Sequence, residues 1–301
     1  MLGNVEIDWV AERSFAAIPA LHPGVRRVIA CEIRRWRRSW WSRATRSEWR
    51  QFKQSLRECG YDAIVDTQGL LKSAILARVA CGVRYGMDWR SSREPLRPFY
   101  DRVFEIPRSL HAVERNRMLC ALALGYDVPA TLHYGLQPVH EPSCWLPDGS
   151  FVVFLHATSH PRKLWPEERW VELGCRYAQS GVFVVLPWGS AAELERAQRL
   201  AAQLPGAVVP DRLDLRSAAG LLAGAAAVVG VDTGLTHLAA ALDRPVVGIY
   251  GATSPERTGV YSSGQATSIG SNAGFPTVDE VCAALGGMGV APTDIAPRRS
   301  P

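Results

Sequence analysis

The residues best suited to chemistry in this 301-residue sequence lie where an apolar run, 228–231, passes directly into Asp232-Thr233-Gly234-Leu235-Thr236-His237. A strand that enters a helix through a glycine-containing turn makes a seat for an anion, because the first N–H groups of the helix lack intrahelical partners and its dipole is positive there. We expect this segment to hold a phosphate, with His237 supporting the loop or touching the ligand. The alternative is that Asp232 or Thr233 only caps the helix and that His237 only packs.

A second loop of the same kind follows the apolar run 151–155 and contains Thr158, Ser159 and Lys163 ahead of Pro166. Hydroxyl groups and an ammonium group beside the start of a helix suit a pyrophosphate, whose negative charge grows when a bond to it breaks. We therefore expect Lys163 and Asp232 to be the residues closest to the chemistry. The alternative for this loop is a capped helix start with a surface lysine.

A third loop, 186–189, leads to Glu193, whose carboxylate would accept hydrogen bonds from ribose hydroxyls. Three loops of one domain would then offer phosphate donors and a ribose acceptor, which predicts a nucleotide-diphosphate site. The triplet Asp-Thr-Gly at 232–234 also occurs in aspartic proteases, but here it opens a helix and no second copy exists in the chain. Neither G-x-G-x-x-G after the early strands nor G-x-x-x-x-G-K-[ST] occurs, which argues against a dinucleotide redox site and a P-loop.

A basic and aromatic stretch between Arg26 and Arg50 contains nine arginines against two glutamates, with four tryptophans interleaved. Arginine binds carboxylates and phosphates through two parallel hydrogen bonds, and tryptophan favours the membrane interface. An anionic lipid headgroup suits this pattern better than nucleic acid, the competing polyanion. We expect a membrane surface as partner through residues 34–50, and no nucleic acid. The alternative is a solvated basic helix face over core tryptophans.

The elements that would position these residues alternate regularly. Expected strands lie at 151–155, 182–186, 207–209, 227–231 and 246–250, and expected helices at 166–181, 191–204, 215–225, 235–242 and 278–285. Strands that are apolar throughout and separated by helices predict a parallel sheet covered on both faces. The first half repeats this pattern less cleanly, with strands near 5–10, 25–29, 63–65 and 83–85 and helices near 47–59 and 70–80.

The sequence thus predicts two doubly wound α/β domains, 1–140 and 150–290, joined by a proline-rich linker and followed by a flexible tail, 291–301. Such sheets bind ligands at the carboxyl ends of their strands, so we expect the chemistry between the domains.

Composition excludes several classes of protein. The chain has no apolar signal core at its start and no run near the roughly 18 apolar residues that would span a bilayer. Its seven cysteines are widely scattered, which fits neither a disulfide framework nor a zinc site, and we expect reduced, mostly buried thiols. We expect a cytoplasmic enzyme, peripheral to the inner membrane, that needs no metal or other cofactor.

Several long motifs resemble the ADP-heptose-dependent glycosyltransferases of lipopolysaccharide core synthesis, glycosyltransferase family 9, and most closely the heptosyltransferase I branch. The segments that carry the resemblance are 34–37, 68–73, 86–89, 93–95, 111–115, 156–170, 231–238 and 241–245. The resemblance implies a GT-B fold, ADP-L-glycero-D-manno-heptose as donor, Kdo2-lipid A as acceptor, and inversion at the anomeric carbon.

The resemblance also implies roles for single residues. On the donor side it points to Thr158, Ser159, Lys163, Asp232, Thr233, Gly234 and Leu235 for the diphosphate and sugar, and to Glu193 for the ribose. On the acceptor side it points to Arg34, Arg35, Lys72, Trp89 and Arg93 near the Kdo carboxylates.

One departure concerns the start of the chain. Family members begin with a strand and a Ser-Ser/Leu-Gly-Asp loop whose aspartate acts as base, whereas this chain opens at a segment that matches the second strand. We expect roughly 25 residues to be absent, which would leave sheet edges unpaired and cost a base worth about 10²–10⁴-fold in rate. This predicts a poorly stable and nearly inactive chain, with Asp66 as a remote substitute base.

Two rival functions remain open. One is a nucleotide-sugar epimerase of similar architecture, which would need no arginine- and tryptophan-rich stretch. The other is a degenerate, non-catalytic ADP-sugar-binding protein, which would bind ADP tightly without transfer.

Overall fold

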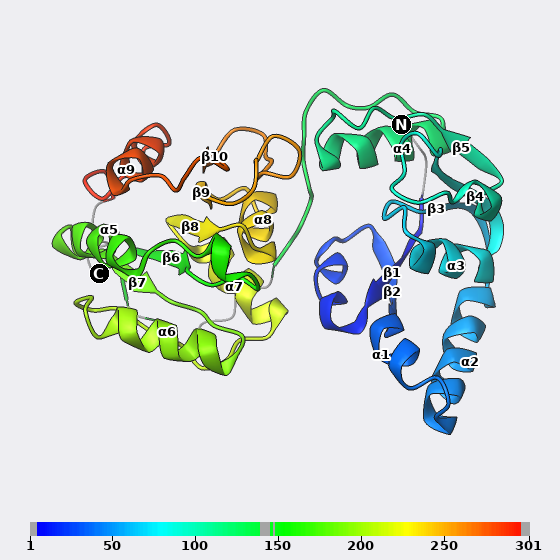
Figure 1. Cartoon of the computed structure of the whole chain (residues 1–301), viewed down its shortest axis with the longest axis horizontal. Coiled ribbons are helices and arrows are strands. Elements are labelled where there is room, and N and C mark those ends of the chain that lie inside the picture. Colours follow the sequence, from blue (N-terminus) through cyan, green and yellow to red (C-terminus); the bar gives the residue numbers. More distant parts are fainter. Residues whose placement is uncertain (1–4, 139–144, 147, 296–301) are drawn as a thin grey trace. The chain divides into compact units, whose positions relative to one another are not determined.

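The computed structural model describes residues 5–138, 145–146 and 148–295. The chain divides into two compact units, Met1–Ala130 (unit 1) and Thr131–Pro301 (unit 2), each with strands and helices of its own (Figure 1). Each unit is described by itself.

Unit 2 contains a five-stranded, entirely parallel sheet in the order β10-β9-β8-β6-β7. Its strands are β6 (Phe151–Leu155), β7 (Phe183–Val185), β8 (Ala227–Val231), β9 (Val246–Tyr250) and β10 (Ala266–Gly270). Its helices are α5 (Glu167–Gln179), α6 (Ala191–Ala201), α7 (Leu215–Gly224), α8 (Gly234–Ala241) and α9 (Val278–Gly286).

Helices cover both faces of this sheet because its central strands are apolar on both faces. Every residue of β6, β8 and β9 is buried. On one face, Phe154 packs against Trp170 of α5, with ring centroids 5.0 Å apart. On the other face, Gly230 lies so close to α8 that a Cβ atom there would come within 2.2 Å of Thr236 Oγ1. The predicted doubly wound unit is confirmed.

Most predicted elements of unit 2 are confirmed within a few residues, and two differ. The segment expected as strand 207–209 forms a single parallel bridge between Val208 and Val185 instead. Strand β10 was not predicted, since Ala266-Thr267-Ser268-Ile269-Gly270 has little apolar character. Residues Ala291 and Ile295 pack against the core of unit 2, which differs from the tail expected after 290; residues 296–301 lie outside the described part of the chain.

Unit 1 contains two parallel sheets, β1-β2 and β3-β4-β5. Its strands are β1 (Ile7–Glu12), β2 (Val25–Cys31), β3 (Gly60–Val65), β4 (Cys81–Met87) and β5 (Arg102–Phe104). Its helices are α1 (Ile33–Arg38), α2 (Arg43–Arg57), α3 (Leu71–Val79) and α4 (Ala112–Leu124). Strand β5 and helices α1 and α4 were not predicted.

The two sheets of unit 1 are linked by side chains. Among the described residues β1 pairs only with β2 and β3 only with β4. The carboxylate of Asp8 on β1 accepts a hydrogen bond from Tyr61 Oη of β3 at 2.8 Å and from Arg27 Nε of β2 at 2.7 Å. Burial alone would raise the pKa of Asp8, but the hydrogen bonds from Arg27, Tyr61 and Arg26 outweigh it and lower this pKa. Buried side-chain contacts therefore hold β1, β2 and β3 together.

All six described cysteines are free, as the sequence predicts, and Cys144 lies outside the described residues. The expectation that they are mostly buried is wrong, because only Cys31 is buried and Cys81 is exposed. None of the described helices is both long enough and apolar enough to cross a membrane.

Candidate donor and acceptor sites

The donor-side loops of unit 2 begin at the point where the strand order reverses. Strand β6 lies between β7 and β8, so the chain leaves β6 toward β7 and later returns to β8 on the other side of β6. Loops that follow two such neighbouring strands diverge toward opposite faces, and this switch point is where open α/β sheets bind ligands. The loop after β6 carries Thr158, Ser159 and Lys163, and the turn after β8 carries Asp232 and Thr233.

The structure joins these two loops through Asp232. Lys163 Nζ lies 2.6 Å from Asp232 Oδ2, and Thr158 Oγ1 donates to the Asp232 carbonyl oxygen at 3.2 Å. Both side chains of the ion pair are partly exposed, Lys163 at 24% and Asp232 at 17%, so a ligand can reach them from solvent. The structure thus pairs Lys163 with Asp232 at the carboxyl edge of the sheet, and the roles expected for them in the chemistry remain predictions.

Asp232 is held in its charged form by its surroundings. His237, whose Nε2 lies 3.8 Å from Asp232 Oδ1, and Lys163 hold the pKa of this carboxyl far below its usual range against the opposing effect of burial. Thr253 Oγ1 also donates to Asp232 Oδ2 at 3.1 Å. Asp232 therefore stays ionised at neutral pH and fixes the position of the Lys163 ammonium group.

Thr253 is a site residue that the sequence did not reveal. It follows β9, the next strand of the sheet, in the segment Gly251-Ala252-Thr253-Ser254. Thr253 could have been found in the sequence, because it is a polar residue shortly after an apolar strand, as Thr158 and Asp232 are.

The start of α8 is open to an anion. No side chain caps the helix at Thr233, so the first N–H groups of α8 are left for solvent or a ligand. A Cβ atom added at Gly234 would have no protein atom within 4 Å, so the space beside this residue is empty. Beneath it, the buried Thr236 hydroxyl donates to the Val231 carbonyl at 2.7 Å and fixes the turn between strand and helix.

Glu193 sits in the first turn of α6, beyond the end of β7. Its Oε2 accepts a hydrogen bond from Gly189 N at 2.7 Å, and its backbone N–H donates to Ser190 Oγ at 3.4 Å. These bonds fix the carboxylate over the loop 186–190. A ribose role for Glu193 remains a prediction, as do the roles of Ser159 and Leu235.

The acceptor-side residues of unit 1 also follow the carboxyl ends of parallel strands: Arg34 and Arg35 after β2, Lys72 after β3, and Trp89 and Arg93 after β4. Burial raises the pKa of the Cys31 thiol to about 11, with Glu12 adding to the shift and Lys72 opposing it. Lys72 therefore lies within electrostatic reach of the end of β2. The Glu94 carboxylate accepts a hydrogen bond from Leu71 N, which joins the Lys72 segment to the Arg93 segment.

Arg35 differs from its neighbours. Its guanidinium group is bonded to the carboxylates of both Glu32 and Glu48, so its charge is compensated within the protein. Among the residues that the structure describes, no carboxylate lies at ion-pair distance from the Arg34 side chain, which is exposed. Of the two, Arg34 is better placed to meet an anionic ligand.

Asp66, considered as a substitute base, is buried and hydrogen-bonded within the protein. It is 6% exposed, its Oδ1 accepts from Gln68 N and Gly69 N at 3.0 and 3.1 Å, and its Oδ2 accepts from Tyr100 Oη at 2.7 Å. Three of its roughly four lone-pair positions are thus used within the protein, and this carboxylate holds the loop 66–70 in place.

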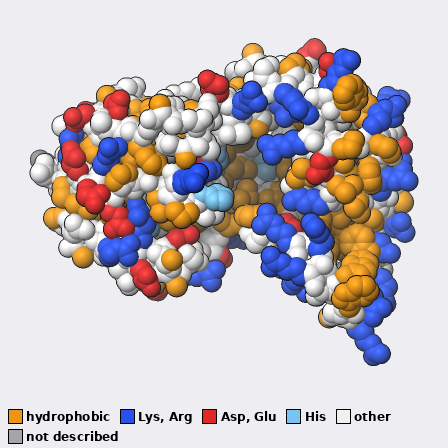
Figure 2. All heavy atoms as spheres, in the orientation of Figure 1, with side chains coloured by type: hydrophobic (Ala, Val, Ile, Leu, Met, Phe, Trp, Pro, Cys, Tyr) orange, Lys and Arg blue, Asp and Glu red, His pale blue; other side chains and the backbone are white. Residues whose placement is uncertain are grey.

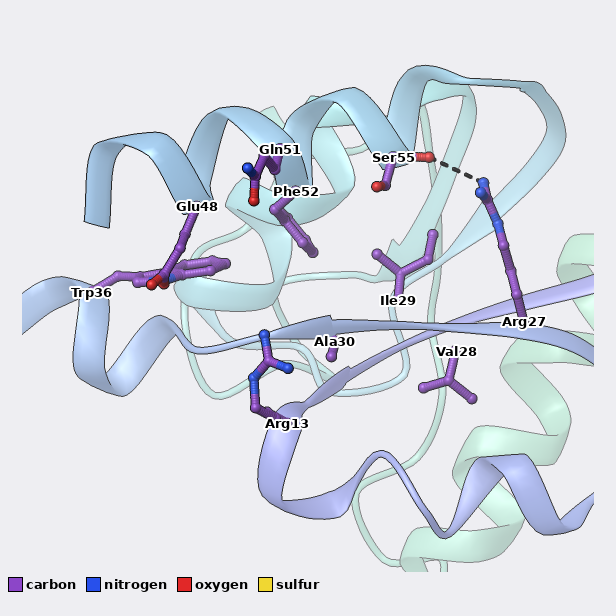
Figure 3. A pocket seen from close by; sticks show the side chains of 10 residues that line it. All are labelled: Arg13, Arg27, Val28, Ile29, Ala30, Trp36, Glu48, Gln51, Phe52 and Ser55. Carbon is purple, nitrogen blue, oxygen red and sulfur yellow. Dashed lines mark hydrogen bonds between the residues drawn. The ribbon is translucent and has the colours of Figure 1, made fainter. Parts of the chain in front are cut away.

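A cavity of about 270 Å³ lies between β2 and α2 (Figure 3). Its lining is made of Arg13, Arg27, Val28, Ile29, Ala30, Trp36, Glu48, Gln51, Phe52 and Ser55. Its polar groups bond to protein atoms: Trp36 Nε1 donates to Glu48 at 2.8 Å, and Arg27 donates to the Ser55 carbonyl at 3.0 Å. The cavity contains none of the predicted site residues.

Comparison with known proteins agrees with this geometry. The model of glycosyltransferase family 9 (heptosyltransferase) matches residues 49–286. Lipopolysaccharide heptosyltransferase 1 of Pseudomonas aeruginosa PAO1 is 50% identical over 87% of this chain and 74% of its own length, and that of Escherichia coli K12 is 46% identical over 87% and 83%.

Among solved structures, the E. coli heptosyltransferase WaaC with ADP has a TM-score of 0.86 and 41% identity, covering 94% of this chain and 90% of WaaC. WaaC with ADP-2-deoxy-2-fluoro heptose has a TM-score of 0.77 and 43% identity, covering 88% and 83%. A UDP-N-acetylglucosamine 2-epimerase from Listeria monocytogenes shares the fold alone, at a TM-score of 0.54 and 13% identity, so the epimerase alternative is not favoured.

Each unit is an α/β unit with parallel strands, and unit 2 has an ion pair and an uncapped helix at its switch point. Together with this extent of similarity, these features lead to one conclusion. The chain has the GT-B fold and belongs to glycosyltransferase family 9, the heptosyltransferases.

Proposed function

We propose that this protein transfers L-glycero-D-manno-heptose from ADP-heptose to the Kdo of Kdo2-lipid A in lipopolysaccharide inner-core synthesis, with inversion at the anomeric carbon. The observation that supports this most directly is the Lys163–Asp232 pair, 2.6 Å apart, beside the uncapped start of α8. The relative WaaC has been solved with ADP and with ADP-2-deoxy-2-fluoro heptose, which suits a nucleotide-sugar donor here.

In the proposed reaction the acceptor oxygen attacks the anomeric carbon, the bond from that carbon to the diphosphate oxygen breaks, and ADP leaves. The hydroxyl proton passes to a base as the new bond forms. The leaving diphosphate gains negative charge, and a preorganised ammonium group together with helix N–H groups stabilises it without a metal ion. Lys163 and the N–H groups of Gly234 and Leu235 take this role, while Asp232 holds Lys163 in position.

The test is a transfer assay with ADP-heptose and Kdo2-lipid A, using Lys163→Ala, Asp232→Asn and the neighbouring surface change Arg162→Ala as control. Removing one group that stabilises the leaving charge costs about 10²–10³-fold in kcat. We expect such losses for Lys163→Ala and a smaller one for Asp232→Asn, with the control unchanged. The proposal would be contradicted if all three variants turned over substrate as fast as the wild type. Tight ADP binding by the wild type without any transfer would favour the non-catalytic alternative.

We further propose that unit 1 meets the membrane through the turn between α1 and α2. Trp36 and Trp49 of the arginine- and tryptophan-rich stretch belong to the core, with ring centroids 5.6 Å apart, so they are not available to a partner. Trp40 and Trp41 are 45% and 87% exposed. Arg37, Arg38, Arg43 and Arg46 around them are exposed as well, and Figure 2 shows basic side chains beside hydrophobic ones over unit 1.

An exposed tryptophan pair ringed by arginines is suited to an anionic lipid surface, since the indole rings favour the interface and each basic residue adds about 1 kcal/mol of attraction. On this proposal the enzyme is peripheral to the cytoplasmic face of the inner membrane. Vesicles containing anionic lipid should bind the wild type and bind Trp41→Ala several-fold more weakly. Trp9→Ala, which changes an exposed tryptophan on β1, is the control; equal weakening by both variants would argue against a defined contact.

A further inference from the structure

The donor loop of unit 2, residues 157–163, carries Lys163 and is held mainly at its two ends. Its residues are exposed or half-buried, whereas His156 before it and Trp165 after it are completely buried. Within the loop, Lys163 N donates to the His160 carbonyl at 2.9 Å, a bond that spans a single turn. The place of Lys163 in the site therefore depends on how the residues at the ends of the loop are fixed.

Trp165, at the far end of the donor loop, is held from two sides. Its indole Nε1 donates to the Pro276 carbonyl at 3.0 Å, and its ring packs edge-on against Trp170, with centroids 5.0 Å apart. Its own carbonyl accepts a hydrogen bond from Arg196 Nη2 at 2.7 Å. Arg196 lies on α6, one turn after Glu193. A side chain of α6 therefore fixes the end of the loop that follows β6.

The guanidinium group of Arg196 is largely buried at the base of the donor loop. The side chain is 12% exposed, and its Nη1 lies 2.9 Å from Oε1 of Glu167, the first residue of α5. Burial lowers the pKa of Arg196, and Glu167 opposes this shift. The pKa of His156 is lowered first by burial and then by the positive charge of Arg196. Arg196 is therefore bonded to one end of the loop and lies within electrostatic reach of the other.

Arg199 provides a comparison within the same helix. It binds the same carboxylate, with Nη2 lying 2.8 Å from Glu167 Oε1, but its side chain is 56% exposed. In the part of the chain that the structure describes, no hydrogen bond joins the Arg199 side chain to residues 156–165. Exposed ion pairs of this kind contribute little to stability. Both arginines thus connect α6 to α5, and only Arg196 also holds the donor loop.

We propose that Arg196 is a positioning residue of the donor site, which holds the Trp165 carbonyl and thereby sets the place of Lys163 relative to Glu193. The inference rests on the proposed function and extends it to a residue that does not touch the ligand. An ammonium group stabilises a leaving diphosphate only from a fixed position, because preorganised charge needs no rearrangement during the reaction. A displacement of about 1 Å can cost about 10²-fold in rate.

The test is a double-mutant cycle on ADP affinity, measured by calorimetry with Arg196→Gln, Lys163→Ala and the double variant. In the wild-type background, Lys163→Ala removes a charged hydrogen bond and should weaken ADP binding roughly tenfold or more. In the Arg196→Gln background we expect this cost to be about fivefold smaller, because a displaced Lys163 has less binding to lose. Arg199→Gln is the matched control, since it removes the same charge from the same helix; in its background the cost of Lys163→Ala should be unchanged.

A purely structural role of Arg196 would lower the melting temperature and leave the effects of Arg196→Gln and Lys163→Ala on ADP affinity multiplicative, which overturns the inference. An equal change in the Arg199→Gln background would overturn it as well. If Arg196→Gln fails to fold, Arg196→Lys keeps the charge and takes its place in the cycle, where multiplicative effects again count against the inference.

The cycle also separates this inference from the proposed function. A wild type that binds ADP and transfers no heptose would contradict the proposed function, while the result of the cycle would still decide the role of Arg196, because the cycle is measured on binding alone. A wild type that binds no ADP would contradict both.

Discussion

At the scale of single residues, the burial of the side chains next to the candidate donor site cannot be read from the sequence. His156, at the end of β6, is completely buried, and neither ring nitrogen has a hydrogen-bond partner among the described residues. Burial lowers its pKa to about 4, and the positive charge of Arg196 contributes. This histidine is therefore neutral in the folded protein and acts through packing beneath the donor loop 157–163.

The pKa of His156 predicts a dependence of stability on pH. An unfolded histidine titrates near 6.5, so between pH 6.5 and 4 the unfolded state binds a proton that the folded state does not. Stability should fall as pH falls through this window, by at most about 3 kcal/mol. Urea unfolding at pH 7 and pH 5 should show a smaller loss for His156→Gln than for the wild type. An equal loss in both would contradict the prediction, and the exposed His160→Gln is the control.

At the scale of elements, the turn from β8 into α8 separates two glycines with different tasks. Gly230 packs against α8, where a Cβ atom would come within 2.2 Å of Thr236 Oγ1 and 3.0 Å of Leu155 Cβ. Gly234 faces empty space at the start of the helix. Gly230 is needed for the packing of α8 on the sheet, and Gly234 leaves room for a ligand.

Alanine substitutions at Gly230 and Gly234 should therefore affect the stability of the protein in different ways. Gly230→Ala should destabilise the protein by about 1–3 kcal/mol through overpacking. Gly234→Ala should leave stability unchanged or raise it by up to about 1 kcal/mol, because alanine costs less entropy in a helix. ADP affinity should nonetheless fall about tenfold in Gly234→Ala if a diphosphate approaches this backbone. Thermal melts with and without ADP measure both quantities; unchanged ADP affinity would place the diphosphate elsewhere.

At the scale of the whole molecule, the two units have separate cores. A core of unit 2 is built around Phe154, Trp165 and Trp170, while a core of unit 1 is built around Trp36 and Phe52. Domains with their own cores often unfold in separate steps rather than in one two-state transition. The expectation of a poorly stable chain, made from the family resemblance, stays a prediction that denaturant unfolding addresses.

Denaturant unfolding followed by tryptophan fluorescence should show two transitions, with unit 1 unfolding first. ADP should raise only the later transition, since a ligand stabilises the unit that binds it, by about 2.7 kcal/mol at 100 times its Kd. A Trp36→Phe variant should report which transition belongs to unit 1. A shift of the earlier transition by ADP would contradict the assignment of the donor site to unit 2.

The sequence by itself determined the doubly wound architecture and pointed to the candidate donor-site residues. Short, continuous apolar runs such as 227–231 favour strands buried on both faces, and a glycine turn into a helix after such a strand is a local feature. Asp232 directly follows β8, and Thr158 and Lys163 lie in the loop after β6, so these residues could be found once the two strands were recognised. The short strand 266–270 and helix 112–124 could not, because weak local patterns leave the decision to packing.

The tertiary structure decided which polar side chains meet and which are already satisfied. Lys163 and Asp232 are 69 residues apart in sequence and pair only because β6 and β8 are neighbours. Arg35 and Arg34 look alike in sequence, yet two carboxylates compensate the charge of Arg35, and none of the described carboxylates compensates that of Arg34. Charge compensation depends on distances of a few ångströms between distant segments, and a sequence pattern does not contain those distances.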